Sequence, residues 1–284
     1  MNLFQRIFVK FFDIFNLLSL DVVAGACAGL FFFADMMRLE LSASIYLLLG
    51  MAVWSIYTFD HLLDARKIPQ KALSRRHRYH QKHFRKLSLM TLLVVILGWG
   101  FALKWLSWNG LMVGGLLLSG IILVVIIGLR YAPARLSVLK EASIAFLYVG
   151  GIALVPIWQQ DFGFGSYAWL FYLPGYFILA WYNLVFLSYL DAALDKAQGH
   201  QSIMTVLGKK KTRLLLWGLT ALALIYMLVL FFALPSFYHR YTLIWGIMVL
   251  VHAISFMEHP ANIAQARKRL ELSFSLPFLL ILLG

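Results

Sequence analysis

The sequence predicts an all-α polytopic membrane protein, a bundle of nine transmembrane helices. Hydrophobic residues make up 62% of the 284 residues and charged residues only 13%, whereas a soluble domain has about 25% charged residues. The apolar residues are also gathered in runs of about 20, the length that an α-helix needs to cross a bilayer. We expect one membrane-embedded domain over residues 1–284.

The first element expected is an amphipathic helix over residues 1–15. Its bulky apolar residues fall on one helical stripe and its polar residues on the other side, namely Gln5, Arg6, Lys10 and Asp13. Interleaved charges of this kind indicate a helix that lies on the membrane surface. A cleaved signal peptide would instead carry its charges before a single apolar core.

Nine apolar segments follow along the chain. The first eight cover residues 17–36, 43–63, 87–106, 110–129, 141–159, 167–190, 214–234 and 239–257. The last, 272–284, reaches only about 20 Å as a helix, so we expect the ninth helix to begin within residues 265–271.

Basic residues alternate between the two sides of these spans. If the N-terminus is cytoplasmic, 22 of the 25 Lys and Arg residues lie on the cytoplasmic side, mainly in the loops 65–86 and 191–213. The other side holds only Arg38, Lys104 and Arg240. This asymmetry predicts a cytoplasmic N-terminus. The absence of an evident transit peptide favours a prokaryotic plasma (inner) membrane.

The chain has a formal charge of +13, and its basic residues lie in loops between spans rather than on one soluble face. This distribution predicts contact with the lipid bilayer and no nucleic-acid partner. A single cysteine, Cys27, excludes a disulfide within the chain. The sequence makes no prediction about oligomeric state.

Two Asp-x-x-x-Asp motifs, Asp60/Asp64 and Asp191/Asp195, end the second and sixth spans. Only eight Asp occur in the chain, so chance predicts roughly 0.2 such pairs. Residues four apart share one face of a helix. One isolated pair would be explained as hydration of a helix end, whereas two pairs on the same side, facing basic loops, favour a functional site.

The two motifs lie 131 residues apart, which leaves room for four spans. The two motif-bearing helices therefore run in the same direction, as in a four-helix pseudo-repeat about an axis along the membrane normal. Four facing carboxylates would repel one another, and Mg²⁺ bound with a lipid diphosphate would relieve that repulsion. We expect the lipid tail to lie in an apolar channel below.

The basic stretch 75–83 has two interpretations, a loop that binds lipid headgroups or a lid over a diphosphate. Its three histidines do not show zinc-ligand spacing with a fourth ligand. His61 is offset from the motif face by about 100°, so we expect it to pack or to hydrogen-bond at the rim.

Two further stretches carry a family resemblance. Residues 191–208 contain the second Asp motif followed by Gly199, Thr205 and Gly208, and residues 131–133 read Tyr-Ala-Pro, with Lys140 after them. With the two Asp motifs, these stretches make nearly the whole chain resemble the UbiA superfamily of intramembrane prenyltransferases. The resemblance implies transfer of a prenyl group from a polyprenyl diphosphate to a small aromatic or quinone-precursor acceptor.

The same resemblance implies roles for individual residues. The four carboxylates of Asp60, Asp64, Asp191 and Asp195 would hold Mg²⁺. The diphosphate would be bound by Arg66, Arg76, Arg78 and Lys140. The allylic cation would be stabilised through cation–π attraction by Tyr57, Phe59, Tyr131 and Tyr189.

The chain departs from the family pattern at Ile56, where the first motif usually has Asn. The matching position of the second motif is Leu187, and Asn183 lies one turn earlier. Two alternatives therefore stand beside the transferase, a membrane terpene cyclase and a non-catalytic protein that binds prenyl lipids. A transporter is the weakest alternative, since nothing indicates a pathway to the other side.

Overall fold

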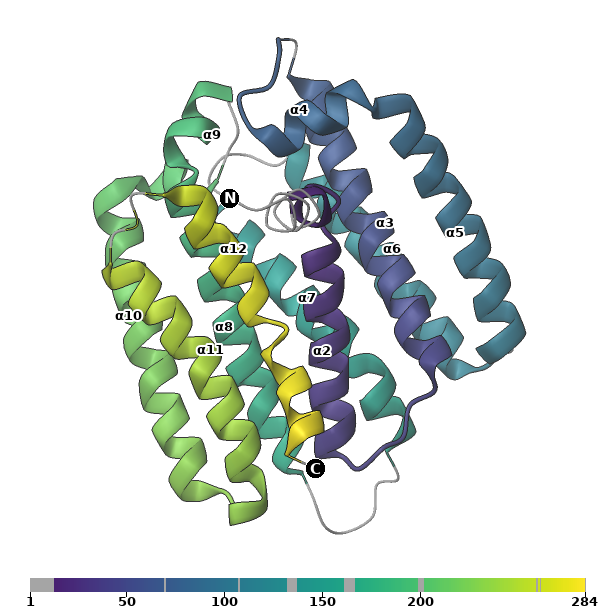
Figure 1. The fold of residues 1–284 in the computed structure, drawn as a ribbon, viewed down its shortest axis with the longest axis vertical. Helices are drawn as coiled ribbons and strands as arrows, with labels where there is room; N and C mark the ends of the chain where they lie inside the picture. The colour runs from purple at the N-terminus through teal and green to yellow at the C-terminus, as the bar shows by residue number, and fades with distance from the viewer. Residues whose placement is uncertain are drawn as a thin grey trace, which may run out of the picture.

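The computed structural model describes residues 13–68, 70–106, 108–131, 137–160, 167–198, 202–258, 260 and 262–283. Every regular element in these residues is a helix (Figure 1), which confirms the all-α prediction. The expected surface helix 1–15 lies outside the described residues except for residues 13–15.

Eight long helices coincide with the first eight predicted spans. They are α2 (Leu20–Met36), α3 (Ala43–Lys67), α5 (Phe84–Leu106), α6 (Gly110–Tyr131), α7 (Ser137–Gln159), α8 (Ala168–Leu190), α10 (Ile203–Ala233) and α11 (His239–Met257). Within the described residues, seven of them are long and apolar enough to cross a membrane. The exception is α2, whose 17 residues reach only about 26 Å.

The predicted ninth span is not confirmed. Residues from 263 onward form α12 (Ile263–Ser273) and then a 3₁₀ helix, η3 (Leu276–Leu282). The two are separated by a turn at Phe274 and Ser275, and Pro277 is the second residue of η3. Proline has no amide hydrogen to donate, and its ring disfavours the helical turn that precedes it, so an α-helix that ends before Pro277 is the expected result.

The two segments predicted as basic loops are largely helical. α4 (Arg75–Lys82) lies in the first, and α9 (Ala192–Gln198) together with the start of α10 lies in the second. α10 is broken at Gly208, whose φ of 77° and ψ of 165° are open essentially only to glycine. The apolar run alone placed the start of this helix at residue 214, because the basic residues before it hid the helical turns.

The long helices pack with α2 and α7 between two groups (Figure 1). α3, α5 and α6 lie on one side and α8, α10 and α11 on the other. α4, α9 and the start of α12 all lie at the same end of the bundle, opposite the C-terminus. We call this the motif end, because both Asp motifs lie there.

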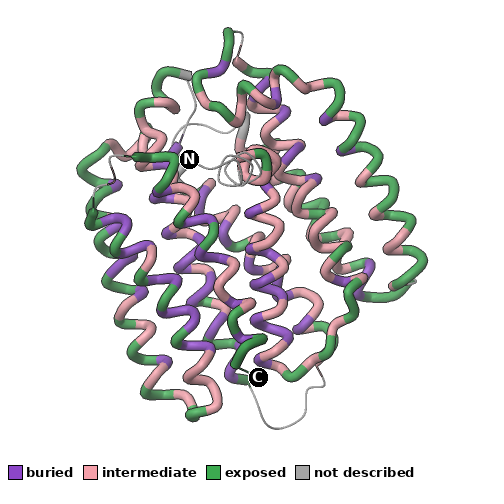
Figure 2. Tube along the Cα trace, viewed as in Figure 1, coloured by how far each residue is buried: buried purple, intermediate pink, exposed green. Residues whose placement is uncertain are grey.

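The buried core lies among α2, α8 and α11, while α5 is exposed along most of its length (Figure 2). The ring of Phe32 in α2 contacts Tyr172, Tyr176 and Tyr241, with centroid distances of 5.6, 5.0 and 5.5 Å. Of the apolar stretch of α5 only 11% is buried, against 61% of that of α11. Exposed leucine and isoleucine side chains on α5 are suited to contact lipid.

Candidate functional site

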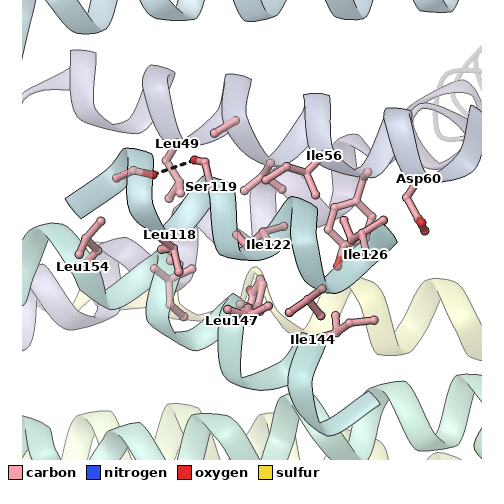
Figure 3. Close-up of a pocket in the computed structure, with 18 of the residues that line it drawn as sticks. Leu49, Ile56, Asp60, Leu118, Ser119, Ile122, Ile126, Ile144, Leu147 and Leu154 are labelled. Carbon is pink, nitrogen blue, oxygen red and sulfur yellow. Dashed lines mark hydrogen bonds between the residues drawn. The ribbon is translucent and has the colours of Figure 1, made fainter. Parts of the chain in front are cut away.

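An apolar cavity of about 840 Å³ lies between α3, α6 and α7 (Figure 3). Its walls are mostly aliphatic, including Leu49, Ile56, Leu118, Ile122, Ile126, Ile144 and Leu147. The one labelled hydroxyl, that of Ser119, donates to the Gly115 carbonyl at 2.8 Å and so adds little polarity. Along α3 the lining extends from Ile45 to Lys67, roughly 33 Å of helix.

A second, polar cavity of about 480 Å³ lies at the motif end. Three of the motif carboxylates line it, Asp64, Asp191 and Asp195, and so do the cations of Arg75, Arg76, Lys140, Arg267 and Lys268. Asp64 and Lys140 line both cavities. The polar cavity therefore adjoins one end of the apolar one, and Asp60 marks that end in Figure 3.

The two Asp motifs have different backbones. Asp60 and Asp64 lie within α3, which continues to Lys67. Asp191 instead follows the last residue of α8, and α9 begins one residue later. The Asp195 amide still donates to the Asp191 carbonyl at 2.9 Å, so the second pair also keeps a helical turn and a shared face.

Burial raises the pKa of Asp195, and the nearby Asp191 carboxylate adds to this effect. A raised pKa means that the folded protein resists negative charge at this position. A bound cation would offset that cost, because it would attract the ionised carboxylate. This is the electrostatic behaviour expected of a carboxylate that faces a cation site.

Arg267 of α12 forms ion pairs with two carboxylates, that of Asp191 and that of Glu271, the latter at 3.6 Å. Burial opposes the charge of Arg267, but these two carboxylates outweigh burial and raise its pKa. The Arg76 guanidinium of α4 also contacts Glu271, at 3.4 Å. Glu271 thus joins the two arginines at the rim of the polar cavity.

The remaining predicted site residues divide into three groups. Tyr57 and Asp60 line the apolar cavity. Arg66, Arg78, Phe59 and Tyr189 line neither cavity. The side chain of Tyr131 lies outside the described residues.

Two of the residues off the cavities have other contacts. The Arg78 guanidinium donates to the carbonyls of Ala72 and Leu73 at 3.0 and 3.2 Å. Tyr189 meets Phe256 edge to face, with ring centroids 6.4 Å apart. The structure therefore does not bring these side chains to the carboxylates.

Glu141 is a site residue that sequence reasoning missed. Its Oε1 accepts a hydrogen bond from the Ile203 amide at 2.9 Å, at the start of α10. Its Oε2 is buried and has no hydrogen-bond partner among the described residues, and the residue lines the apolar cavity. The sequence did contain an indication of this role, because the spacing of Glu141, Ile144 and Tyr148 places them on one face of α7.

Ile56 stands where the family pattern has Asn, and it lines the apolar cavity (Figure 3). The aliphatic wall therefore extends to within one helical turn of Asp60. Asn183 does not replace the missing amide, because its Oδ1 lies 3.3 Å from His252 Nε2 and the residue lines neither cavity.

Fold and site together define an all-helical integral membrane protein whose acidic and basic residues adjoin a long apolar cavity. No known protein-family profile matches the chain, and no curated protein sequence matches it. Among solved structures, the apo structure of a UbiA homolog from Aeropyrum pernix K1 is similar, with a TM-score of 0.63 over 92% of this chain and 98% of that one.

The identity between the two sequences is 13%, so the similarity is one of fold. This chain has a UbiA-like fold, and the resemblance predicted from its motifs is confirmed at that level.

Proposed function

We propose that this protein is a Mg²⁺-dependent prenyltransferase of the UbiA superfamily. It would transfer a prenyl group from a polyprenyl diphosphate to a small aromatic or quinone-precursor acceptor. The observation that carries the proposal is the junction of the two cavities at Asp64 and Lys140. An apolar tail and a charged headgroup need such adjoining spaces.

The donor set at this junction fits Mg²⁺. Mg²⁺ binds through one or two carboxylates together with water and phosphate oxygens, and Asp60, Asp64 and Asp195 offer carboxylates along the walls of the two cavities. These carboxylates would hold the ion beside the diphosphate, where it would supply charge neutralisation of the leaving group. Asp191 pairs with Arg267, so its proposed role is to hold that arginine in the polar cavity.

The cations of the polar cavity would bind the diphosphate oxygens. Arg76, Arg267 and Lys140 all line this cavity, and a guanidinium presents two parallel donors to phosphate. Arg66 and Arg78, which the resemblance implies as further ligands, lie off both cavities, so we assign their proposed role to Arg267.

The apolar cavity would hold the prenyl chain and exclude water from the allylic cation. When the allylic carbon–oxygen bond breaks, the electron pair leaves with the diphosphate. The aromatic rings of Tyr57 and Tyr148, which line the same cavity, would stabilise the cation. The acceptor carbon then bonds to the allylic carbon, and its proton passes to Glu141 Oε2.

We further propose that the motif end faces the cytoplasm, because most of the basic residues lie in the segments at that end.

The test is diphosphate release by the purified protein from geranyl, farnesyl and longer allylic diphosphates, with and without Mg²⁺ and aromatic acceptors. We expect release that requires both Mg²⁺ and an acceptor. Asp64→Asn and Asp195→Asn should each lower the rate at least 100-fold, as loss of a charge-stabilising group does. Glu258→Gln is the matched control, because that carboxylate is exposed and pairs with Arg269.

A non-catalytic prenyl-lipid-binding protein is the second candidate function. It is favoured by Ile56 in place of the motif Asn and by the ion pair that Arg267 makes with Asp191. Binding of every donor without release would support it over the transferase. Mg²⁺-dependent release that needs no acceptor would instead indicate a membrane terpene cyclase.

A further inference from the structure

His61, Asp64 and His77 converge at the rim of the polar cavity. Each offers one ligand atom, and these three atoms all lie within 4.8 Å of one another. His61 and Asp64 come from the last turns of α3, and His77 comes from the first turn of α4. All three residues also line the polar cavity.

The imidazole of His61 lacks the hydrogen bonds that a buried ring normally makes. Both of its nitrogens are buried and neither has a hydrogen-bond partner among the described residues. Its neighbours are other rings, those of Tyr57, His77 and His80, with centroids 6.4, 6.1 and 5.2 Å away. An unsatisfied buried polar group destabilises the folded state, and a metal ion would relieve this at one of the two nitrogens by accepting its lone pair.

Hydrogen bonds between side chains and the backbone hold the two helices in this arrangement. The Ser74 side chain caps α4 by accepting a hydrogen bond from the His77 amide at 2.9 Å. The Gln81 side-chain amide donates to the carbonyls of Ala65, Ile68 and Gln70 at 3.2, 3.1 and 3.0 Å. α4 is thereby tied to the C-terminal end of α3, so the ligands come from a fixed framework.

The donor set selects the kind of ion. Mg²⁺ prefers oxygen ligands, whereas two imidazoles and a carboxylate suit a first-row transition ion such as Zn²⁺. Arg76, the chain neighbour of His77, is paired with Glu271 at 3.4 Å, which reduces its repulsion of a cation. We propose that His61, Asp64 and His77 bind one divalent transition ion, with water completing its coordination.

This site shares only Asp64 with the proposed Mg²⁺ site, and its two histidine ligands belong to it alone. A carboxylate has two oxygens and can bridge two ions, so Asp64 can join the transition ion to Mg²⁺. The bound ion would fasten α4, which carries Arg76, to the motif of α3. Metal binding of this kind needs no prenyl donor and does not depend on the proposed transferase activity.

The experiment uses full-length protein without a polyhistidine tag, purified in detergent and stripped of metal with a chelator. We expect one equivalent of Zn²⁺ to bind in the presence of millimolar Mg²⁺, measured by calorimetry and by metal analysis of the protein. Co²⁺ in the same site should give the visible absorption of a low-coordinate nitrogen–oxygen complex. No stoichiometric Zn²⁺, or Zn²⁺ displaced by millimolar Mg²⁺, would overturn the proposal.

Two variants locate the site. His61→Phe and His77→Phe keep an aromatic ring and remove the ligand atom, and each should weaken Zn²⁺ binding at least tenfold, the lower end of the effect of disturbing a metal site. His83→Phe is the matched control, because the His83 ring lies outside the cluster and contacts Tyr79 in a tilted arrangement, with ring centroids 4.6 Å apart. Equal Zn²⁺ affinity in all three variants would overturn the assignment, and the wild-type stoichiometry remains decisive if a variant fails to fold.

Discussion

Glu141 is the residue whose carboxylate joins the apolar cavity to the start of α10. Through Oε1 it satisfies the Ile203 amide, one of the donors that a helix N-terminus leaves without an internal partner. Oε2 remains for a proton from the acceptor. Glutamine keeps the first contact and loses the second function.

Glu141→Gln should therefore lower kcat about 100-fold or more, the usual contribution of a general base, while donor binding changes little. Single-turnover product formation and equilibrium binding of a non-hydrolysable donor analogue measure the two effects separately. Unchanged kcat in this variant would exclude Glu141 as the base.

Glu271 matters for stability, because it neutralises two arginines in a mostly buried position. Burial opposes its ionisation, but the guanidinium groups of Arg76 and Arg267 outweigh burial and lower its pKa from 4.5. A lowered carboxyl pKa stabilises the folded state above the ordinary pKa, and that stabilisation is lost as pH falls through the lowered value.

We expect Glu271→Gln to lower the free energy of unfolding by about 3 kcal/mol near neutral pH, because Arg76 and Arg267 both lose the charge of this buried carboxylate. The difference from wild type should stay constant down to about pH 4.5 and shrink below it. Thermal unfolding in detergent across this range is the measurement. A difference that grew on acidification would contradict the assigned direction of the pKa shift.

At the scale of elements, the spacing of α3, α6 and α7 determines the length of chain that the apolar cavity accepts. Gly115 of α6 lines this cavity, and a Cβ there would meet nothing within 4 Å. Gly120, on the same helix, also has open space at its Cβ, but it is exposed and does not line the cavity.

Gly115→Phe should shorten the longest donor that reacts and leave short donors unaffected, because the ring fills the end of the cavity far from Asp60. Gly120→Phe should leave the donor range as in wild type. The measurement is kcat/KM for donors of increasing length, compared between the two variants and the wild type. The same shift in both variants would mean that the prenyl chain lies elsewhere.

For the whole molecule, orientation follows from the charge asymmetry of the segments that join the spans. Lys71 and Lys209 are exposed near the motif end, and Lys104 is exposed at the end of α5 away from it. Cys27 is the single native cysteine, so a Cys27→Ser background permits labelling at chosen positions.

In that background, Lys104→Cys should react with a membrane-impermeant maleimide in intact cells. Lys71→Cys and Lys209→Cys should react only after the cells are opened, because the positive-inside rule places them in the cytoplasm. The mass shift of the labelled protein on a gel measures the reaction in intact cells and in opened cells. The reverse pattern would place the motif end outside the cell.

Hydrophobic runs and helical spacing determined the all-α class and the approximate bounds of eight long helices, since both are properties of neighbouring residues. The same local patterns located the two Asp motifs. They did not reveal the turn that divides 263–283, where a proline interrupts an otherwise apolar run. They also hid the start of α10 behind its basic first turns.

Tertiary packing decided which charged groups meet. Arg267 lies 76 residues from Asp191 and pairs with it, and Glu141 lies 62 residues from the amide that it caps. Tertiary packing also brought His77 close to His61 and Asp64. It left Arg66 and Arg78 outside the lining of both cavities. A side chain's partner across helices depends on how those helices pack and rotate, which periodicity within one segment does not specify, whereas burial in a membrane depends on composition alone.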